Sequence, residues 1–171
     1  LAELGLVWII SRFIGRLSLT TATLLFIVYS ALNGATLSVI FMVYSPAVIT
    51  KVFFITAGTF GAMAAFGYFT KTDLTSLGKL LIMALVGIII ASLVNLFLIK
   101  SGTFDLIVSY IGVLVFVGLT AYDSQKIKNL LLEADDVNEE SQKIALIGSL
   151  ALYLDFINLF LYLLKIFGRE K

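Results

Sequence analysis

Long apolar stretches separated by short polar breaks make up most of the chain. They cover approximately residues 17–44, 48–69, 77–99, 104–122 and 144–167. A helix needs about 20 mostly apolar residues to cross the hydrocarbon core of a bilayer. Each stretch is long enough, so the pattern predicts five membrane-spanning helices within one transmembrane domain, residues 1–171. The long break at 123–143 is acidic in its middle and is expected to be a loop.

The amino end carries a shorter apolar stretch. Residues 1–10 are too short to cross a bilayer, and the chain begins with Leu1 rather than Met. The stretch also lacks the basic leader and small-residue cleavage site of a signal peptide. We interpret it as the second half of a further span, and we expect the chain to be part of a longer natural protein.

Composition narrows the class of protein. Apolar residues make up 60% of the chain and charged residues 13%, against about 45–50% and about 25% in an ordinary soluble domain. This excludes a soluble enzyme, a disordered segment and a nucleic-acid binder, and it predicts the lipid bilayer as the chain's surroundings. The chain has no Cys and no His, which excludes disulfides and thiolate metal sites and leaves any pH response near neutrality to carboxylates. We expect no bound cofactor.

The lysines and arginines give a weak indication of orientation. Seven of the twelve fall on one predicted side of the membrane: Arg12, Arg16, Lys71, Lys79, Lys126, Lys128 and Lys143. The other side receives Lys51, Lys100, Lys165, Arg169 and Lys171. The positive-inside rule favours the first side as cytoplasmic.

Small and polar residues predict how the spans pack. Small residues crowd the 48–69 span, some of them at four-residue spacing; they are Ala57, Gly58, Gly61, Ala62, Ala64, Ala65 and Gly67. Because lipid tails compete equally for apolar surface, close approach at small residues is expected to hold helices together. Polar side chains inside the spans are expected to make hydrogen bonds between helices; they are Asn33, Ser38, Ser92 and Asn95.

Asp155 is the clearest candidate for chemistry, because an acid at the centre of a membrane helix costs about 2.5–3.5 kcal/mol. Helical spacing places it on a small or polar stripe, opposite a face of Leu, Ile and Phe. The stripe consists of Gly148, Ala151, Asp155, Asn158 and Tyr162. The stripe turns Asp155 toward the bundle interior or a wet cavity. The alternative is a structural acid held by an arginine or by hydrogen bonds.

Asp123 is the second candidate, at the predicted end of the 104–122 span. It shares a helix face with small and polar residues, so it can also face inward, although a local ion pair with Lys126 is the ordinary alternative. Consecutive spans can pair antiparallel, which would bring Asp123 opposite Asp155. The two predicted depths differ, so this pairing requires a wet crevice or a longer fourth helix.

If these aspartates meet, their chemistry is specific. Two neighbouring carboxylates share one proton and titrate as a coupled pair, which would make a pH sensor without histidine. Their deprotonated oxygens suit a hard cation such as Ca²⁺, which makes Asp123 and Asp155 candidate transient calcium ligands. Arg12, predicted on the same side as Asp123, is a candidate counter-ion that would hold a gate shut. The alternative for Arg12 is an ordinary positive flank.

Several motifs, in order, resemble the Bax inhibitor family, the transmembrane Bax inhibitor motif proteins, and its bacterial members in particular. They are LNGATLS at 32–38, TAGTFGA at 56–62, TKTDL at 70–74, TAYDSQKIK at 120–128 and YLDFINLF at 153–160. The resemblance runs from about Arg12 to the carboxyl end. It implies an all-α, polytopic seven-helix bundle, of which the first helix and part of the second are absent from this chain.

The resemblance also implies a function. It indicates a pH-sensitive calcium leak channel, with protons and permeating Ca²⁺ as partners and the bacterial inner membrane as its location. Aspartates of the sixth and seventh family helices form the sensor, and these positions match Asp123 and Asp155. The family's latching arginine matches Arg12.

Two other classes of function stay open. A non-conducting interaction protein would regulate a membrane protease or a stress or cell-death pathway, using the acidic segment 133–140. An intramembrane aspartyl protease would also use paired aspartates. Such enzymes carry a Gly-x-Gly-Asp run, whereas this chain reads Leu152-Tyr153-Leu154-Asp155, so we expect no enzymatic activity.

Overall fold

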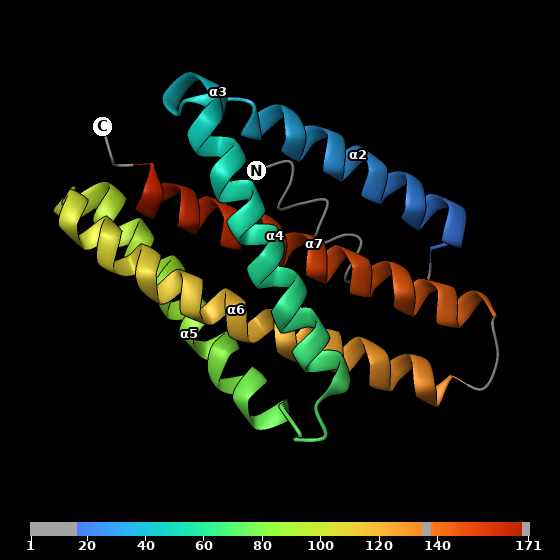
Figure 1. The fold of residues 1–171 in the computed structure, drawn as a ribbon. Coiled ribbons are helices and arrows are strands. Elements are labelled where there is room, and N and C mark those ends of the chain that lie inside the picture. Colours follow the sequence, from blue (N-terminus) through green and yellow to red (C-terminus); the bar gives the residue numbers. More distant parts are fainter. Residues whose placement is uncertain (1–16, 135–137, 169–171) are drawn as a thin grey trace.

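The computed structural model describes residues 17–134 and 138–168, and the described chain is built from helices (Figure 1). In order, the elements are α2 (Leu19–Leu37), α3 (Ile40–Val43), α4 (Pro46–Phe69), α5 (Thr75–Val94), the π-helix η1 (Asn95–Ile99), α6 (Gly102–Glu133) and α7 (Glu139–Phe167). Within this part of the chain, five helical stretches are long and apolar enough to cross a membrane. The prediction of an all-α transmembrane bundle is confirmed. The partial span expected at 1–10 lies outside the described residues.

Side-chain caps begin several of these helices. Ser45 accepts a hydrogen bond from the backbone N–H of Val48, and Pro46 occupies the first turn of α4, where its missing N–H removes no helical bond. Ser18 and Ser101 cap α2 and α6 in the same way. At α7, Asn138 and Ser141 form a reciprocal capping box, which satisfies two of the backbone donors exposed at a helix start.

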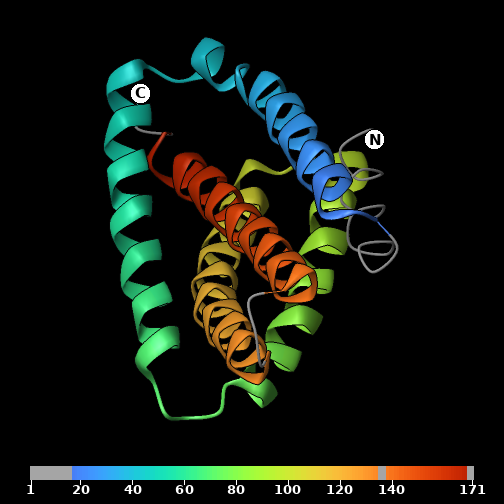
Figure 2. The same cartoon turned by 90° about the vertical axis from the view of Figure 1, so that its right-hand side faces the viewer.

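Helices α6 and α7 pack along each other at the centre of the fold. Helix α4 crosses both of them, α5 lies against α6, and α2 lies against α7, as Figures 1 and 2 show from two directions. The core between α4, α6 and α7 includes Val52, Phe116, Leu159 and Leu164. Each central helix therefore contacts at least two others, and these contacts fix the residues on their facing sides.

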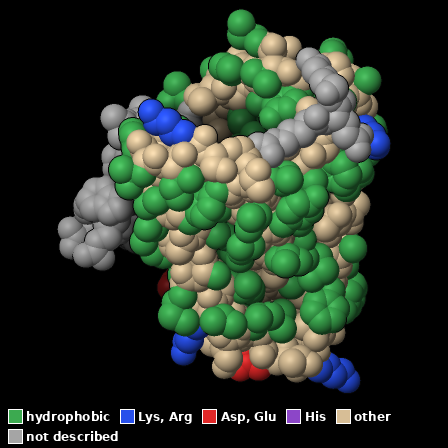
Figure 3. Space-filling model, turned by 90° about the vertical axis from the view of Figure 1, so that its left-hand side faces the viewer, with side chains coloured by type: hydrophobic (Ala, Val, Ile, Leu, Met, Phe, Trp, Pro, Cys, Tyr) green, Lys and Arg blue, Asp and Glu red, His purple; other side chains and the backbone are tan. Residues whose placement is uncertain are grey.

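The outer surface is apolar, as expected of helices that face lipid. Phe54 on α4, Met83 on α5 and Leu114 on α6 are each at least 65% exposed. In Figure 3, hydrophobic side chains cover the middle of the visible face, while most of the visible charged side chains gather toward its upper and lower edges. This distribution matches the sequence prediction of a bilayer as the surrounding solvent.

The small residues of α4 pack as predicted at one end of the helix only. Gly67 is buried, and a side chain there would meet the backbone of Ala121 on α6. Gly58 and Gly61, by contrast, have no described atom near the place a Cβ would occupy. The expected close approach of helices is therefore confirmed at Gly67 and wrong for Gly58 and Gly61 within the described chain, because α4 approaches α6 closely at its carboxyl end.

The expected bond from Asn33 is confirmed, since its Nδ2 donates to the hydroxyl of Tyr153 on α7. The Ser92 hydroxyl also reaches another helix, as the hydrogen-bond partner of Tyr162 on α7. The expectation is wrong for Ser38, which donates to the carbonyl of Ala35 in its own helix, and for Asn95, whose carboxamide bonds to the nearby backbone of Ser101.

Candidate functional site

The predicted loop at 123–143 is largely helical. Helix α6 continues to Glu133, ten residues beyond Asp123, and α7 begins at Glu139. The prediction that Asp123 ends its helix is therefore wrong. Residues 123–133 contain no Gly or Pro and include good helix formers such as Lys, Gln and Leu, so nothing in them stops the helix where the apolar run ends.

The longer α6 brings Asp123 level with Asp155. The two carboxyl groups are hydrogen-bond partners across the α6–α7 contact. Such a bond requires that one of them carries a proton. Asp155 is only 4% exposed, and its Oδ2 is buried without a hydrogen-bond partner among the described residues. The sequence left two ways for Asp123 and Asp155 to meet, a wet crevice or a longer helix. The structure has the longer helix, α6.

A cavity of about 360 Å³ lies beside the aspartates, between α5, α6 and α7. Its polar lining consists of Asp123, Lys126, Asp155, Asn158 and Tyr162. The rest of its wall is mainly apolar, with side chains such as Ile89 and Phe116. The carboxyl pair therefore has space beside it in which an ion or water molecules fit.

A second, smaller cavity of about 110 Å³ lies between α6 and the first half of α7. Asp123, Lys126 and Ala151 line both cavities, and Gly148 lines the smaller one. The stripe predicted on α7, from Gly148 to Tyr162, thus runs along the two cavities in succession. Asp123 stands where they adjoin.

Lys126 is the cation that the described structure places at both cavities. It lies one helical turn after Asp123, close enough for its charge to act on that carboxylate. Its ammonium also lies 5.9 Å from the centre of the Tyr122 ring. Arg12, the counter-ion predicted from the sequence, lies outside the described residues.

The described residues do not form a preorganised metal site. Within 17–134 and 138–168, no group of three or more Asp, Glu, His or Cys side chains is placed to hold a metal ion. A calcium ion at this place would meet the two carboxylates and the neutral oxygens near them. That arrangement suits a passing ion better than a resident one, because tight calcium sites supply six to eight oxygen ligands.

Sequence reasoning missed the residues that hold this part of α6 in place. The Gln125 carboxamide donates to the carbonyl of Thr72 (2.8 Å) and accepts from the N–H of Leu74 (2.9 Å). The Ser124 hydroxyl donates to the carbonyl of Ala64 on α4 (2.7 Å). These bonds fix α4 and the α4–α5 loop against α6 next to Asp123. The signal was present, since both residues belong to the TAYDSQKIK motif, but it does not say what they touch.

Comparisons with known proteins agree with the sequence motifs. The family model described as "Inhibitor of apoptosis-promoting Bax1" matches residues 1–171. The chain is 53% identical over 172 residues to the inner membrane protein YbhL of Escherichia coli K12, covering 100% of this chain and 73% of that protein. It is 52% identical over 171 residues to an uncharacterized protein of Borreliella burgdorferi, covering 100% of this chain and 73% of that protein. A protein of Deinococcus radiodurans is 46% identical over 166 residues, which cover 97% of this chain and 71% of that protein.

Proposed function

The chain belongs to the Bax inhibitor family, and from this premise we propose that it is a channel through which Ca²⁺ leaks across the membrane under proton control. Helices that cross a membrane make the bilayer its medium. Because a similar protein is named as an inner membrane protein, we place this chain in the bacterial inner membrane. The proposed role is transport rather than catalysis, without a bound cofactor.

The observation that carries the proposal is the Asp123–Asp155 pair at the junction of two cavities. Ionisable groups at membrane depth are expensive and mark ion or proton pathways. Here two of them, on different helices, meet where the packed core is interrupted. A single structural acid would need neither the second carboxyl nor the adjoining space.

We base proton control on the contact between the two carboxyls. Two carboxylates in hydrogen-bonding range repel each other when both are ionised, so the pair holds one proton and titrates as a unit. Loss of that proton exposes negative oxygens to the cavities, which attract a hard divalent cation. We propose that deprotonation also changes the interaction of the pair with Arg12 and favours opening.

The test measures Ca²⁺ entry into liposomes that contain the protein and a trapped calcium dye, from mildly acidic to mildly alkaline pH. Wild type is compared with Asp123→Asn and Asp155→Asn. Glu140→Gln is the matched control, because it also removes one carboxylate but lies in the first turn of α7, away from both cavities. A pH-dependent flux whose midpoint moves in both aspartate variants, and stays in the control, is the expected result.

Two outcomes would overturn parts of the proposal. Flux no greater than that of empty liposomes would reject the channel. A flux whose midpoint is the same in all variants would keep the leak but reject the aspartate pair as its sensor.

An interaction protein is the second candidate, and the outer face of α4 favours it. Gly58 and Gly61 are exposed there, and small residues on a membrane helix allow the close approach of another helix. Such a protein, acting on a membrane protease or a stress pathway, should retain its partner when Asp155 is replaced by Asn. Replacement of Gly61 by Leu should release that partner.

A further inference from the structure

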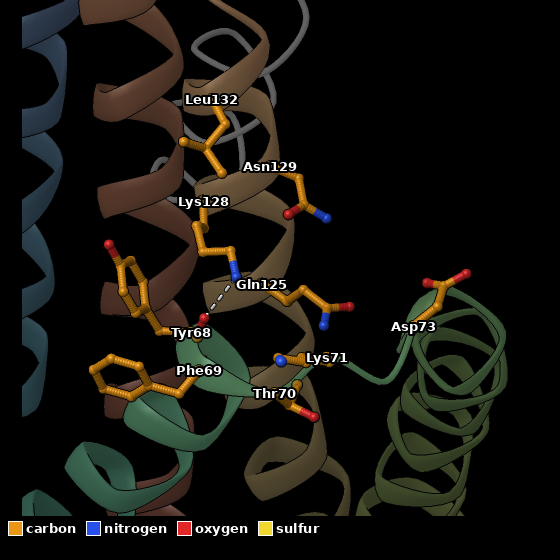
Figure 4. Close-up of a pocket in the computed structure, with 9 residues that line it drawn as sticks. All are labelled: Tyr68, Phe69, Thr70, Lys71, Asp73, Gln125, Lys128, Asn129 and Leu132. Atoms are coloured by element: carbon orange, nitrogen blue, oxygen red, sulfur yellow. Dashed lines mark hydrogen bonds between the residues drawn. The ribbon is translucent and has the colours of Figure 1, made fainter.

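A third and larger cavity, of about 640 Å³, lies apart from the aspartate pair, at the end of the bundle where α4 ends and α5 begins (Figure 4). Helix α6 passes beside the loop between α4 and α5 and extends beyond it. Its side chains therefore form one side of the cavity. The residues that line the cavity are Tyr68, Phe69, Thr70, Lys71, Asp73, Gln125, Lys128, Asn129 and Leu132. The lining combines basic, amide and aromatic side chains.

The floor of this cavity is fixed. Gln125 is 7% exposed, and its carboxamide bonds to Thr72 and Leu74 span the loop. Because both polar atoms of that carboxamide are engaged with the backbone, the loop cannot move away from α6 without breaking two hydrogen bonds, one buried and one part-buried. The backbone beneath the cavity is therefore preorganised.

Lys128 retains donors for a ligand. Its Nζ donates to the carbonyl of Tyr68 at 2.7 Å and lies 5.4 Å from the centre of the Tyr68 ring. An ammonium group has three N–H donors, so two remain after the bond to Tyr68. Figure 4 shows that bond as a dashed line, at the side of the cavity where Tyr68 and Phe69 lie.

The charge of the lining favours an anion. Lys71 and Lys128 contribute two positive charges, and Asp73 contributes the one carboxylate of the lining. The Oδ1 atom of Asp73 accepts the N–H of Thr75 at 2.9 Å. In Figure 4, Asp73 lies on the opposite side of the cavity from Lys128 and Tyr68. The side near α4 is therefore positive.

The position of the cavity relative to the membrane selects the anion. Tyr68 and Phe69, which are 51% and 76% exposed, form the last turn of a membrane-spanning helix. Aromatic side chains at such an end lie at the level of the lipid headgroups, and basic pockets at that level bind acidic headgroups. We propose that this cavity binds the phosphate of an anionic phospholipid between Lys71 and Lys128, with Phe69 against the upper part of its acyl chains.

The experiment compares lipid retention by the purified protein in neutral detergent, using native mass spectrometry. The probes are phosphatidylglycerol, phosphatidylcholine and inorganic phosphate. The variants are Lys71→Gln, Lys128→Gln and the double substitution. Lys51→Gln is the matched control, because it removes an exposed lysine from the other end of α4. Lys128→Arg tests whether another cationic side chain with N–H donors retains the lipid as Lys128 does.

We expect wild type to retain phosphatidylglycerol in preference to phosphatidylcholine. Each lysine lost should weaken retention by about five-fold, the effect of one basic residue near an anionic surface. The control and Lys128→Arg should bind as wild type does, and Phe69→Ala should weaken lipid binding without affecting inorganic phosphate.

Three results would overturn the proposal. The first is equal retention of the two lipids, and the second is unchanged retention by the double variant. The third is competition by inorganic phosphate at the concentration of the lipid, which would indicate a site for the free ion. The two lysines are not part of the hydrophobic core, so the double variant is expected to fold. Gel filtration and thermal unfolding that match those of wild type confirm this, and a change in lipid retention then reports on the cavity alone.

Discussion

Asn33 on α2 donates a hydrogen bond of 3.1 Å to the hydroxyl of Tyr153 on α7, two residues before Asp155. The Tyr153 ring also makes edge contacts with the rings of Phe26 and Tyr29. Helix α2 packs mainly against α7, so this group of side chains holds the first described span to the helix that carries the buried acid.

Replacement of Tyr153 by Phe should weaken the docking of α2. The ring contacts are retained, but Asn33, which is 6% exposed, loses the acceptor of its amide. Hydrogen bonds between membrane helices contribute about 0.6 kcal/mol on average and up to about 1.7 kcal/mol, and we expect a loss in that range. Unfolding in mixed micelles measures it, with Tyr110→Phe, an exposed tyrosine of α6, as control. An unfolding free energy equal to that of the control would show that the bond contributes nothing.

Gly67 should be far less tolerant of substitution than Gly61. A Cβ on Gly67 would overlap the backbone carbonyl of Ala121, and a backbone cannot move aside as a flexible side chain can. We expect Gly67→Ala to destabilise the protein by about 1–3 kcal/mol, the usual cost of overpacking. Gly61→Ala, with no described atom near its new methyl group, should leave the melting temperature in detergent unchanged. Equal effects of the two substitutions would mean that α4 and α6 do not approach as described.

These two glycines also show where sequence reasoning reached its limit. The number of spans follows from length and hydropathy, because the bilayer sets both. In a uniformly apolar helix, hydropathy does not indicate which face packs inward. Gly61 and Gly67 therefore could not be distinguished from the sequence. The helical stripe on α7 was recognisable because Asp155 and Asn158 interrupt an apolar surface. The end of α6 was not recognisable, because hydropathy detects the segment inside the membrane and does not detect a polar helix that continues into water.

Asp73 should respond to pH only in strongly acidic solution. Its hydrogen bonds to the side chain and N–H of Thr75, and the nearby charge of Lys79, hold the pKa of its carboxyl below the ordinary value. Because the folded-state pKa is the lower one, its stabilisation of the α5 start is present above the ordinary carboxyl pKa of about 3.9 and is lost as pH falls through the folded value.

The carboxyl carbon shift of Asp73, followed by NMR during acid titration in micelles, measures this response directly. The amide of Thr75, protected near neutrality, should exchange faster in Asp73→Asn, in which the acceptor is weaker. A titration midpoint at or above the ordinary carboxyl value would contradict the described hydrogen bonds between Asp73 and Thr75.

Lys126 should oppose the entry of cations. Its ammonium borders both cavities that Asp123 borders, so a calcium ion approaching the pair meets a positive charge as well as two carboxyls. Like charges within a few ångströms in a medium of low dielectric repel by about 1 kcal/mol or more. If the protein conducts as proposed, Lys126→Gln should therefore raise Ca²⁺ entry into liposomes by up to about ten-fold at a fixed pH. Lys126→Glu should raise it further. Lys51→Gln, on α4 and outside both cavities, controls for the loss of one positive charge anywhere on the protein. Equal flux in Lys126→Gln and Lys51→Gln, with the Asp155→Asn effect intact, would show that ions pass the aspartates by a route that avoids this lysine. A fall in flux in Lys126→Gln would instead indicate that Lys126 holds Asp123 in its conducting position.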